Sequence, residues 1–381
     1  MIREIGAFHA YFVEFNAGYN AGCGVLQDRP EIVDFGLIFF GDKNSNRREC
    51  PFMSKFLIGI DLGGTNIKTA IFDTEFKTIL ERSDPTEAEA GPAHVLTKIK
   101  NIIKEMLFQL EINQTDMIGM GMGIPGLLDP DQGLSIFSPN FPGWENIHVV
   151  HEMKSEFTFP VFIDNDVRAN LYGEWLFGAG AGHRNIVLIT LGTGLGSGIV
   201  MDGKVLYGQT ASAGEIGHMN MYREGRPCRC GSSGCLGRYV SAVGMVRTFV
   251  EQLELGKASI VQQWVGGESA KITAQMISEA YDLGDELSIA VMHETGKTLG
   301  FGLSNVINLF NPELIIIGGG MSAAGDRLLN TVRDTIKAHS LKLSSQVCKV
   351  VQASMGARAG MVGAAAYAKQ KLERSRKPYM L

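Results

Sequence analysis

A short polar stretch, Asp164-Asn165-Asp166, follows the apolar run 161–163. Transfer of a phosphoryl group to an alcohol needs a carboxylate within hydrogen-bond reach of the attacking hydroxyl, and a neighbouring amide can orient a second hydroxyl. Asp166 is therefore a candidate catalytic base, and Asn165 is a candidate substrate ligand. The structural alternative is that one of these residues caps the helix that Arg168 and Asn170 continue.

Two glycine-rich turns, about 130 residues apart, each join a pair of apolar runs. Glycines allow backbone N–H groups to approach a triphosphate, a threonine hydroxyl adds a donor, and the carboxylate of Asp61 can hold Mg²⁺ through water. Ordinary glycine turns are the alternative, but two facing copies would hold phosphates from both sides. The candidate ATP-binding residues of the two turns are Asp61, Gly63, Gly64, Thr65, Asn66, Lys68, Gly192, Thr193 and Gly194.

A third glycine cluster, Gly318-Gly319-Gly320, comes directly after the apolar run 314–317. Ligands of α/β sheets bind at the carboxyl ends of strands, and backbone without side chains would let adenosine lie flat there. These three glycines are therefore candidate ATP-binding residues as well. Tight packing of a strand-to-helix turn is the alternative explanation.

A histidine and three cysteines have the spacing of a zinc site. His218 ends the stretch 214–218, which includes Glu215, and Cys228, Cys230 and Cys235 follow within the next 17 residues. One imidazole and three thiolates complete a tetrahedral zinc site with no open position, which indicates a structural metal. The alternatives are four unrelated residues or a disulfide. Zinc would brace the loop around Glu215, and the second ring nitrogen of His218 could face a sugar.

Apolar periodicity predicts the elements that position these residues. Strands are expected at 56–61, 66–72, 117–123, 161–163, 185–191, 195–201, 314–317 and 349–352. Helices are expected at 92–110, 273–281, 286–309 and 360–373. Strands that alternate with helices predict an α/β protein, and the repeated strand–turn–strand unit predicts a duplicated fold that holds a nucleotide between its copies.

Composition narrows the class of protein. The chain has 381 residues, 45% hydrophobic and 20% charged, which is enough for two lobes around a cleft. A net charge of -5 provides no basic patch, so a nucleic-acid partner is not expected. No run approaches the roughly 20 apolar residues of a membrane span, and no leader pattern is found at the start, so we expect a cytoplasmic protein without membrane association.

Residues 1–52 lack the periodicity of the rest of the chain. Met53 stands directly before the first strand pattern, so these residues are interpreted as an upstream extension of uncertain structure. A small DNA-binding module would need two capped amphipathic helices joined by a tight turn, and this pattern is not found there.

Taken together, these motifs resemble the ROK family, the bacterial group of sugar kinases and sugar-sensing repressors. The resemblance extends from about Lys55 to about Lys371, and within the family it is closest to the bacterial glucokinases. It implies a two-lobed, ribonuclease H-like fold similar to actin and hexokinase, with the active-site cleft between the lobes. The small lobe would be residues 53–170 with the C-terminal helix 365–381, and the large lobe would be residues 171–364 with the zinc loop.

The same resemblance implies an ATP-dependent hexose kinase with Mg²⁺ and structural Zn²⁺, most similar to enzymes that convert glucose to glucose 6-phosphate in glycolysis. Asp166 would take the proton from the sugar 6-hydroxyl. The residues that would hold other sugar hydroxyls are Asn140, Asn165, Glu215 and His218. Likeness to the family also implies a homodimer or homotetramer.

One position departs from the family pattern. The family commonly has glutamate two residues after the last zinc cysteine, and this chain has Gly237 there. Loss of a charge-assisted hydrogen bond costs about 1.5–3 kcal/mol, enough to change the choice of sugar without abolishing phosphoryl transfer. Fructose, mannose, allose and N-acetylated aminosugars therefore remain alternative substrates. A sugar-responsive transcriptional regulator and a catalytically idle sugar-binding protein are the alternatives from other functional classes.

Overall fold

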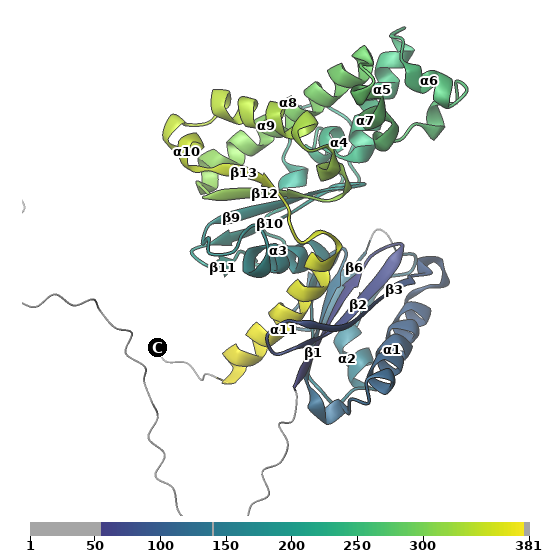
Figure 1. The fold of residues 1–381 in the computed structure, drawn as a ribbon, viewed down its shortest axis with the longest axis vertical. Coiled ribbons are helices and arrows are strands. Elements are labelled where there is room, and N and C mark those ends of the chain that lie inside the picture. The colour runs from purple at the N-terminus through teal and green to yellow at the C-terminus, as the bar shows by residue number, and fades with distance from the viewer. Residues whose placement is uncertain (1–54, 139–140, 377–381) are drawn as a thin grey trace, which may run out of the picture. The chain divides into compact units, whose positions relative to one another are not determined.

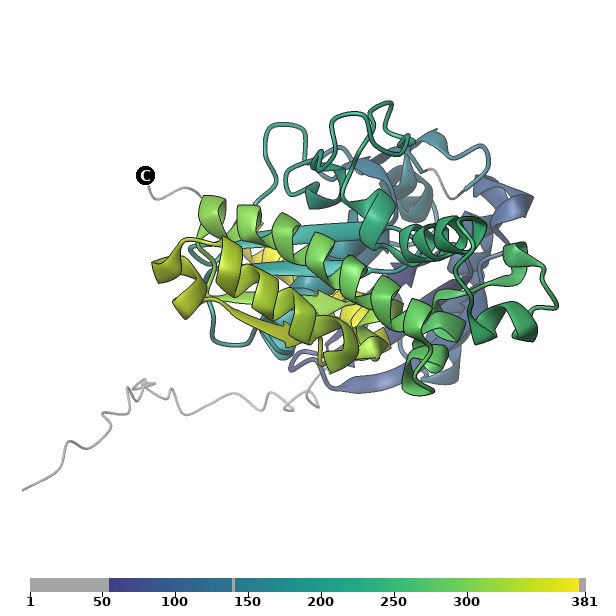
Figure 2. The same ribbon diagram turned by 90° about the horizontal axis from the view of Figure 1, so that it is seen from above.

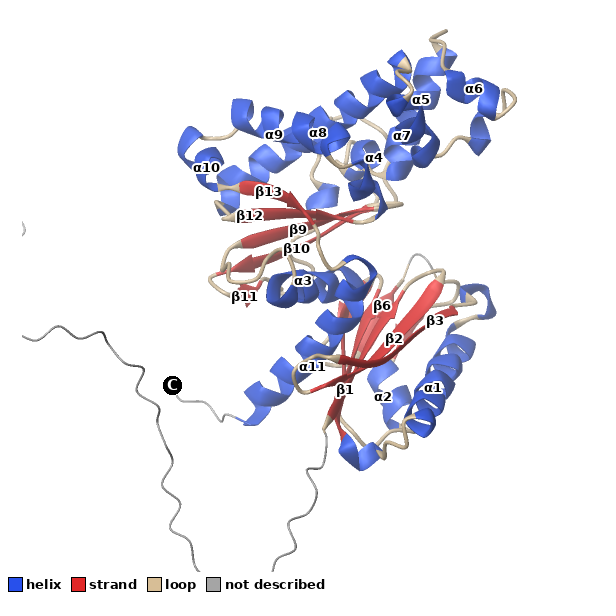
Figure 3. Cartoon of the chain, viewed as in Figure 1, coloured by secondary structure: helices blue, strands red, loops and turns tan. Residues whose placement is uncertain are grey.

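The structure is a computed structural model that describes residues 55–138 and 141–376. The predicted extension, residues 1–52, lies outside the described residues. The described residues form two five-stranded mixed sheets, each covered by helices on both faces (Figures 1 and 3). The α/β class predicted from the apolar patterns is therefore confirmed.

The first sheet has the strand order β3-β2-β1-β4-β8. Strands β1, β4 and β8 are parallel, whereas β2 is antiparallel to both β1 and β3. Helices α1 and α2 cover one face, and the C-terminal helix α11 covers the other. The bounds are β1 Phe56–Leu62, β2 Asn66–Asp73, β3 Thr78–Pro85, β4 Met117–Ile124, β8 Val161–Asn165, α1 Pro92–Gln109, α2 Val149–Lys154 and α11 Ala359–Arg376.

The alternation of side chains along β1 determines which residues meet α11. Successive side chains of a strand point to opposite faces. Ile58 and Ile60 join the core beneath α1, and Leu57 joins the core beneath α11. Gly59 and Asp61 therefore lie on the α11 face as well. A Cβ atom at Gly59 would lie 1.9 Å from a backbone oxygen of α11, so only glycine allows this close packing.

The glycines of β4 bring two helices onto the same face of the sheet. A Cβ atom at Gly121 would lie 1.9 Å from the carbonyl oxygen of Ala364 on α11. A Cβ atom at Gly123 would lie 2.9 Å from the Cβ of Ala169 on α3 (Asp166–Phe177). Met120 and Met122, on either side of Gly121, point the other way, into the core beneath α1. The sheet therefore approaches both helices backbone to backbone.

The second sheet, with the order β11-β10-β9-β12-β13, repeats the topology of the first. Two antiparallel neighbours precede two parallel ones, as in the first sheet. Helix α3 packs on one face, and α8 and α9 cover the other (Figure 1), so that these two helices lie in front of the sheet in the view from above (Figure 2). The bounds are β9 Ile186–Leu191, β10 Leu195–Met201, β11 Lys204–Val205, β12 Leu314–Gly318, β13 Lys349–Gln352, α8 Glu286–Phe310 and α9 Asp326–His339.

Smaller elements complete the described part of the chain. A three-stranded antiparallel sheet lies between β4 and α2 in the sequence, and short helices pack beside α8 and α9. Their bounds are β5 Leu127–Asp129, β6 Leu134–Phe137, β7 Glu145–Ile147, α4 Gly237–Val240, α5 Ala242–Glu254, α6 Ile260–Trp264, α7 Ala274–Asp282 and α10 Lys342–Val347.

The chain passes from the first sheet to the second after α3, and it returns between β13 and α11. Both crossings contact Glu174, whose side chain is buried near the end of α3. Its carboxylate accepts hydrogen bonds from the backbone N–H of Ala179 in the first crossing and of Ser354 and Met355 in the second, at 2.7–3.1 Å. One buried side chain therefore anchors both connections between the sheets.

The strands and helices expected from apolar periodicity are all found, with ends that differ by a few residues. Strand β8 continues through Asp164 to Asn165, two residues beyond the predicted end. The duplicated strand–turn–strand unit is confirmed as a repeated sheet topology. Among the helices of residues 55–138 and 141–376, none combines the length and apolar composition needed to cross a membrane.

We expect Gly121→Ala to lower the free energy of unfolding by about 1–3 kcal/mol, because the added methyl group would overlap the backbone of α11. Urea unfolding would measure the change. Gly320→Ala is the matched control, since a Cβ atom there has no neighbour within 4 Å. Both variants restrict the unfolded chain equally, so an equal free energy of unfolding in the two would contradict the close packing.

Candidate active site

Two candidate carboxylates meet at the carboxyl edge of the first sheet. The parallel register pairs Asp61 with Gly123 on β4, and Gly123 with Asp164 on β8. Asp166 begins α3 directly after β8. A Cβ atom at Gly360, at the start of α11, would lie 2.5 Å from the Cγ atom of Asp61. Two glycines therefore leave the space in which these carboxylates approach each other.

Burial perturbs the protonation of both Asp61 and Asp166. The pKa of Asp166 is raised to about 6. Burial is the larger cause, and the negative charge of Asp61 is the second. Burial also raises the pKa of Asp61, and the ammonium group of Lys68, 3.9 Å from its Oδ2 atom, opposes this rise. A half-buried carboxylate with a pKa near neutrality is well suited to accept a proton.

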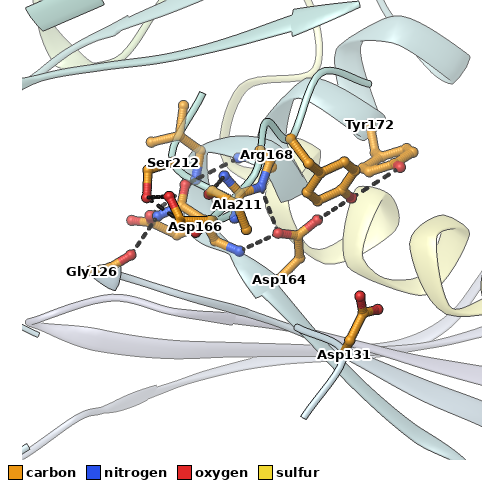
Figure 4. A network of polar contacts seen from close by, with 12 residues as sticks. Gly126, Asp131, Asp164, Asp166, Arg168, Tyr172, Ala211 and Ser212 are labelled. Atoms are coloured by element: carbon orange, nitrogen blue, oxygen red, sulfur yellow. Dashed lines mark hydrogen bonds and ion pairs between the residues drawn. The ribbon is translucent and has the colours of Figure 1, made fainter. Parts of the chain in front are cut away.

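Asp164, the other aspartate of the predicted motif, is fully engaged inside the protein (Figure 4). Its side chain is 2% exposed and forms an ion pair with Nε of Arg168 at 2.6 Å. Its Oδ2 atom accepts a hydrogen bond from the hydroxyl of Tyr207 at 2.6 Å. Asp166 is therefore the aspartate of this pair that remains available for proton transfer.

Asn165 is the N-cap of α3. Its Oδ1 atom accepts hydrogen bonds from the backbone N–H groups of Val167 and Arg168, and its Nδ2 group donates to the carbonyl of Gly126 at 3.2 Å (Figure 4). The capping alternative is confirmed for this residue. The cap fixes the first turn of α3, where Asp166 also accepts a hydrogen bond from the N–H of Val167 at 3.0 Å. Contact of Asn165 with a sugar stays a prediction.

The first glycine turn connects β1 to β2 and is closed by a hydrogen bond from the Gly63 N–H to the carbonyl of Asn66 at 2.9 Å. Thr86 ties the turn to the end of β3, since its hydroxyl donates to the carbonyl of Gly63 at 2.6 Å. Gly64, Thr65 and Asn66 are exposed. The predicted phosphate-binding groups are thus accessible on a turn of fixed shape.

The second glycine turn lies beside the triple glycine of the second sheet. Gly318 pairs with Thr190 in the parallel register of β12 and β9, two residues before the turn Gly192-Thr193-Gly194. Gly319 has a φ of 80°, and a Cβ atom there would lie 2.3 Å from the carbonyl oxygen of Leu191. The structure therefore brings two of the three predicted glycine clusters to one edge of this sheet, and it accounts for Gly319 by backbone geometry.

Glu215 lies on an exposed turn whose backbone is held on both sides. The hydroxyl of Ser197, on β10, donates to the carbonyl of Gly214 and accepts from the N–H of Ile216 at 3.1 Å. Gly214 has a φ of 89°, a conformation that favours glycine. The carboxylate of Glu215 is therefore displayed to solvent by a rigid backbone.

His218, Cys228, Cys230 and Cys235 come together as predicted, with their ligand atoms all within 4.8 Å of one another. The Nδ1 atom of His218 lies 3.6 Å from Sγ of Cys228, and the Sγ atoms of Cys230 and Cys235 are 3.7 Å apart. Sulfurs bound tetrahedrally at about 2.3 Å from zinc lie roughly 3.8 Å apart, whereas a disulfide needs about 2.05 Å. These residues therefore fit a zinc site and do not form a disulfide.

The loop between His218 and Cys235 is also held by contacts that need no metal. The guanidinium group of Arg226 donates to the carbonyls of Arg238 and Gly244 and to the side chains of Thr248 and Glu251, at 2.5–3.1 Å. All four acceptors lie on α4 or α5. Arg226 therefore joins the cysteine loop to these two helices.

Some residues that shape the site could not be found from the sequence, and one predicted residue lies outside the described residues. Tyr207, Ser197 and Gly360 act on residues far away in the chain, and no motif identifies them. Asn140 is the predicted sugar ligand that lies outside the described residues. At Gly237 a Cβ atom would lie 3.3 Å from the carbonyl oxygen of Gly217, so a larger residue there needs only a small adjustment.

The sequence and fold of this chain are similar to those of known proteins. Residues 57–371 match the ROK family. The glucokinase of Halalkalibacterium halodurans is 35% identical over 318 residues, which are 83% of this chain and 96% of that protein. A ROK family glucokinase from Streptomyces griseus, solved with glucose and AMPPNP, has a TM-score of 0.69 and 29% identity, and the match covers 83% of this chain and 99% of that one.

A ROK family transcriptional regulator, a homologue of the E. coli MLC protein, has a TM-score of 0.74 and 28% identity, with 84% of this chain and 78% of that chain covered. The two sheets share one topology, and the structural neighbours include a ROK glucokinase and a ROK hexokinase. The fold is therefore of the actin/hexokinase-like class, as the sequence resemblance implied. The chain belongs to the ROK family.

We expect purified protein to contain about one zinc ion per chain, and Cys230→Ser to lose it, because a thiolate ligand is removed. Elemental analysis would measure the metal content, and thermal unfolding would report the accompanying loss of stability. Cys348→Ser is the matched control for metal content, since Cys348 lies outside the cluster. Metal-free wild-type protein would rule out the zinc site.

Proposed function

We propose that the protein is a kinase that transfers the γ-phosphoryl group of ATP to a hydroxyl of a hexose, with glucose as the expected sugar and its 6-hydroxyl as the acceptor. The observation that supports this most directly is Asp166, a half-buried carboxylate at the start of α3 whose pKa is raised to about 6 beside Asp61. Similarity to glucokinases supports the sugar and the phosphoryl donor.

In this proposal Asp166 acts as the general base. It accepts the proton of the sugar hydroxyl while the hydroxyl oxygen forms a bond to the γ-phosphorus of ATP, and the bond from that phosphorus to the bridging oxygen breaks to release ADP. Asn165 holds the turn that carries Asp166. Glu215 and His218 are the proposed ligands of other sugar hydroxyls, together with Asn140.

The nucleotide would be held by the glycine clusters of the two sheets. Backbone N–H groups of the turns at 63–66 and 192–194 would bind phosphates, and the open edge at Gly318 to Gly320 would accept adenosine. Bound Mg²⁺ would neutralise charge that develops on the phosphates, with Asp61 as its ligand through water. Bound Zn²⁺ would stiffen the loop after Glu215.

A sugar-responsive regulator is the second candidate, because a ROK regulator is among the structural neighbours. Such a function needs a DNA-binding element, and the segment that precedes the first strand lies outside the described residues. A gel-shift assay with DNA from upstream of sugar-utilisation genes would test it. The raised pKa of Asp166, to which the charge of Asp61 contributes, favours the kinase, since a repressor has no need of a base with a raised pKa.

Release of ADP measured over a panel of hexoses and N-acetylated aminosugars would test both the class and the substrate. We expect turnover with glucose and weaker turnover with its isomers. Because Gly237 lacks the carboxylate common at this position in the family, the preference among sugars should be modest. Absence of a phosphate ester with every sugar would refute the proposal.

We expect Asp166→Asn to lower kcat by about 10²–10⁴-fold, because the amide cannot accept the hydroxyl proton, while sugar binding stays within about tenfold. Coupled ADP release and calorimetric sugar binding would measure the two quantities. Asp164→Asn is unsuitable as a control, because Asp164 is buried in an ion pair. Asp326→Asn, on the exposed side of α9, is suitable and should leave kcat unchanged. Unchanged turnover in Asp166→Asn would remove this residue from the mechanism.

The pKa of Asp166 sets the expected dependence of activity on pH. The base works only when it is deprotonated, so kcat/KM should be full above its pKa of about 6 and should fall about tenfold per unit below it. Asp61→Asn removes a negative charge that raises this pKa, so the acid limb should move to lower pH even where the rate itself is reduced. A limb that stays in place in this variant would contradict the proposed coupling of Asp61 and Asp166.

A further inference from the structure

A buried polar network lies next to the proposed base, Asp166 (Figure 4). The ion pair of Asp164 and Arg168 is 2% and 6% exposed, and it occupies the end of β8 and the first turn of α3. Asp164 also accepts hydrogen bonds from the N–H of Asn165 at 2.7 Å and from the hydroxyl of Tyr207 at 2.6 Å. The network is not used by the reaction described above, yet it is built from residues on both sides of Asp166.

The network joins α3 to the segment 206–214, which follows β11. Arg168 donates through Nη1 to the carbonyl of Ala211 at 2.8 Å, and its guanidinium group lies 5.0 Å from the centre of the Tyr207 ring. Ala211 has a φ of 53°, which is uncommon for a residue with a side chain and persists only where surrounding contacts hold it. One ion pair therefore fixes the segment at two points, Tyr207 and Ala211.

The segment 206–214 leads directly to Glu215. Within it, the N–H of Ala213 donates to the carbonyl of Tyr207 at 3.0 Å, and at its end Ser197 binds the backbone on both sides of Glu215. An unbroken set of contacts thus runs from Arg168, two residues after Asp166, to the backbone of Glu215. Segments held by few and specific contacts respond locally when one contact is removed.

We propose that Tyr207 and Arg168 are positioning residues that hold Glu215 at a fixed place relative to Asp166 and so determine the affinity for the acceptor sugar. This inference rests on the proposed kinase function. In the proposed reaction, neither Tyr207 nor Arg168 touches the reacting atoms. Asp166 keeps its own support from the Asn165 cap, so loss of the network should weaken sugar binding more than the chemical step.

Tyr207→Phe is the sharpest test, because it removes the hydroxyl that binds Asp164 and keeps the aromatic ring beside Arg168. We expect the KM for the sugar to rise about tenfold, with kcat and the KM for ATP within about threefold of wild type. Hydrogen exchange of the amides of residues 206–216 should become faster. Tyr281→Phe, on α7, is the matched control and should change neither quantity.

Arg168→Lys gives a second and independent measurement. A lysine keeps a positive charge beside Asp164, but its single ammonium group replaces a fork that reaches both Asp164 and the carbonyl of Ala211. We expect the same rise in the KM for the sugar and the same faster exchange of residues 206–216. Because the charge is retained, this variant should fold, which circular dichroism would verify.

The outcomes separate this inference from the proposed function. An unchanged KM for the sugar in both variants would overturn the inference, even with faster exchange, because the network would then be structural only. If wild-type protein phosphorylates no sugar, the proposed kinase function fails. In that case sugar binding by calorimetry takes the place of KM, and unchanged affinity in Tyr207→Phe overturns the positioning role.

Discussion

The site depends on one packing constraint: the backbone of α11 must lie directly against the first sheet. Gly59 and Gly121 make this possible, since a side chain at either position would overlap the helix backbone. The same face of β1 then carries Asp61 to the start of α11, and the same face of β4 carries Gly123 to the start of α3. Because side chains of a strand alternate between its two faces, the close packing of α11 on this face also places Asp61 and Asp166 on the same side of the sheet.

Burial of Asp166, together with the nearby charge of Asp61, is unfavourable for folding when Asp166 is ionised. A carboxylate whose pKa is raised in the folded state makes the protein less stable above that pKa than below it, so ionised Asp166 opposes folding at neutral pH. Only one of the two sheets has a carboxylate at this place, because Thr190 stands at the corresponding end of β9. The repeated topology therefore supplies two similar strand ends, of which the one in the first sheet carries a carboxylate.

Local features of the sequence predicted eight of the strands, the glycine turns and the cysteine cluster, because each is determined by residues near one another in the chain, whereas β3 and β11 were not predicted. The helix cap was predicted as an alternative and is realised by Asn165. What could not be predicted is set by contacts between distant residues. Asp164 and Tyr207 are 43 positions apart, and Gly59 meets a helix that begins some 300 residues later. The short strands β5 to β7 have too few residues to show a period, so they too were missed.

The position of α11 has a consequence for how the protein is made. The first sheet begins at Phe56, yet the helix that covers one of its faces starts only at Ala359 and so leaves the ribosome about 300 residues after the first strand. Until then Leu57, Ala70 and Phe72 have no apolar cover from Met361, Val362 and Ala365. Synthesis at about 5–20 residues per second leaves this surface without its covering helix for tens of seconds.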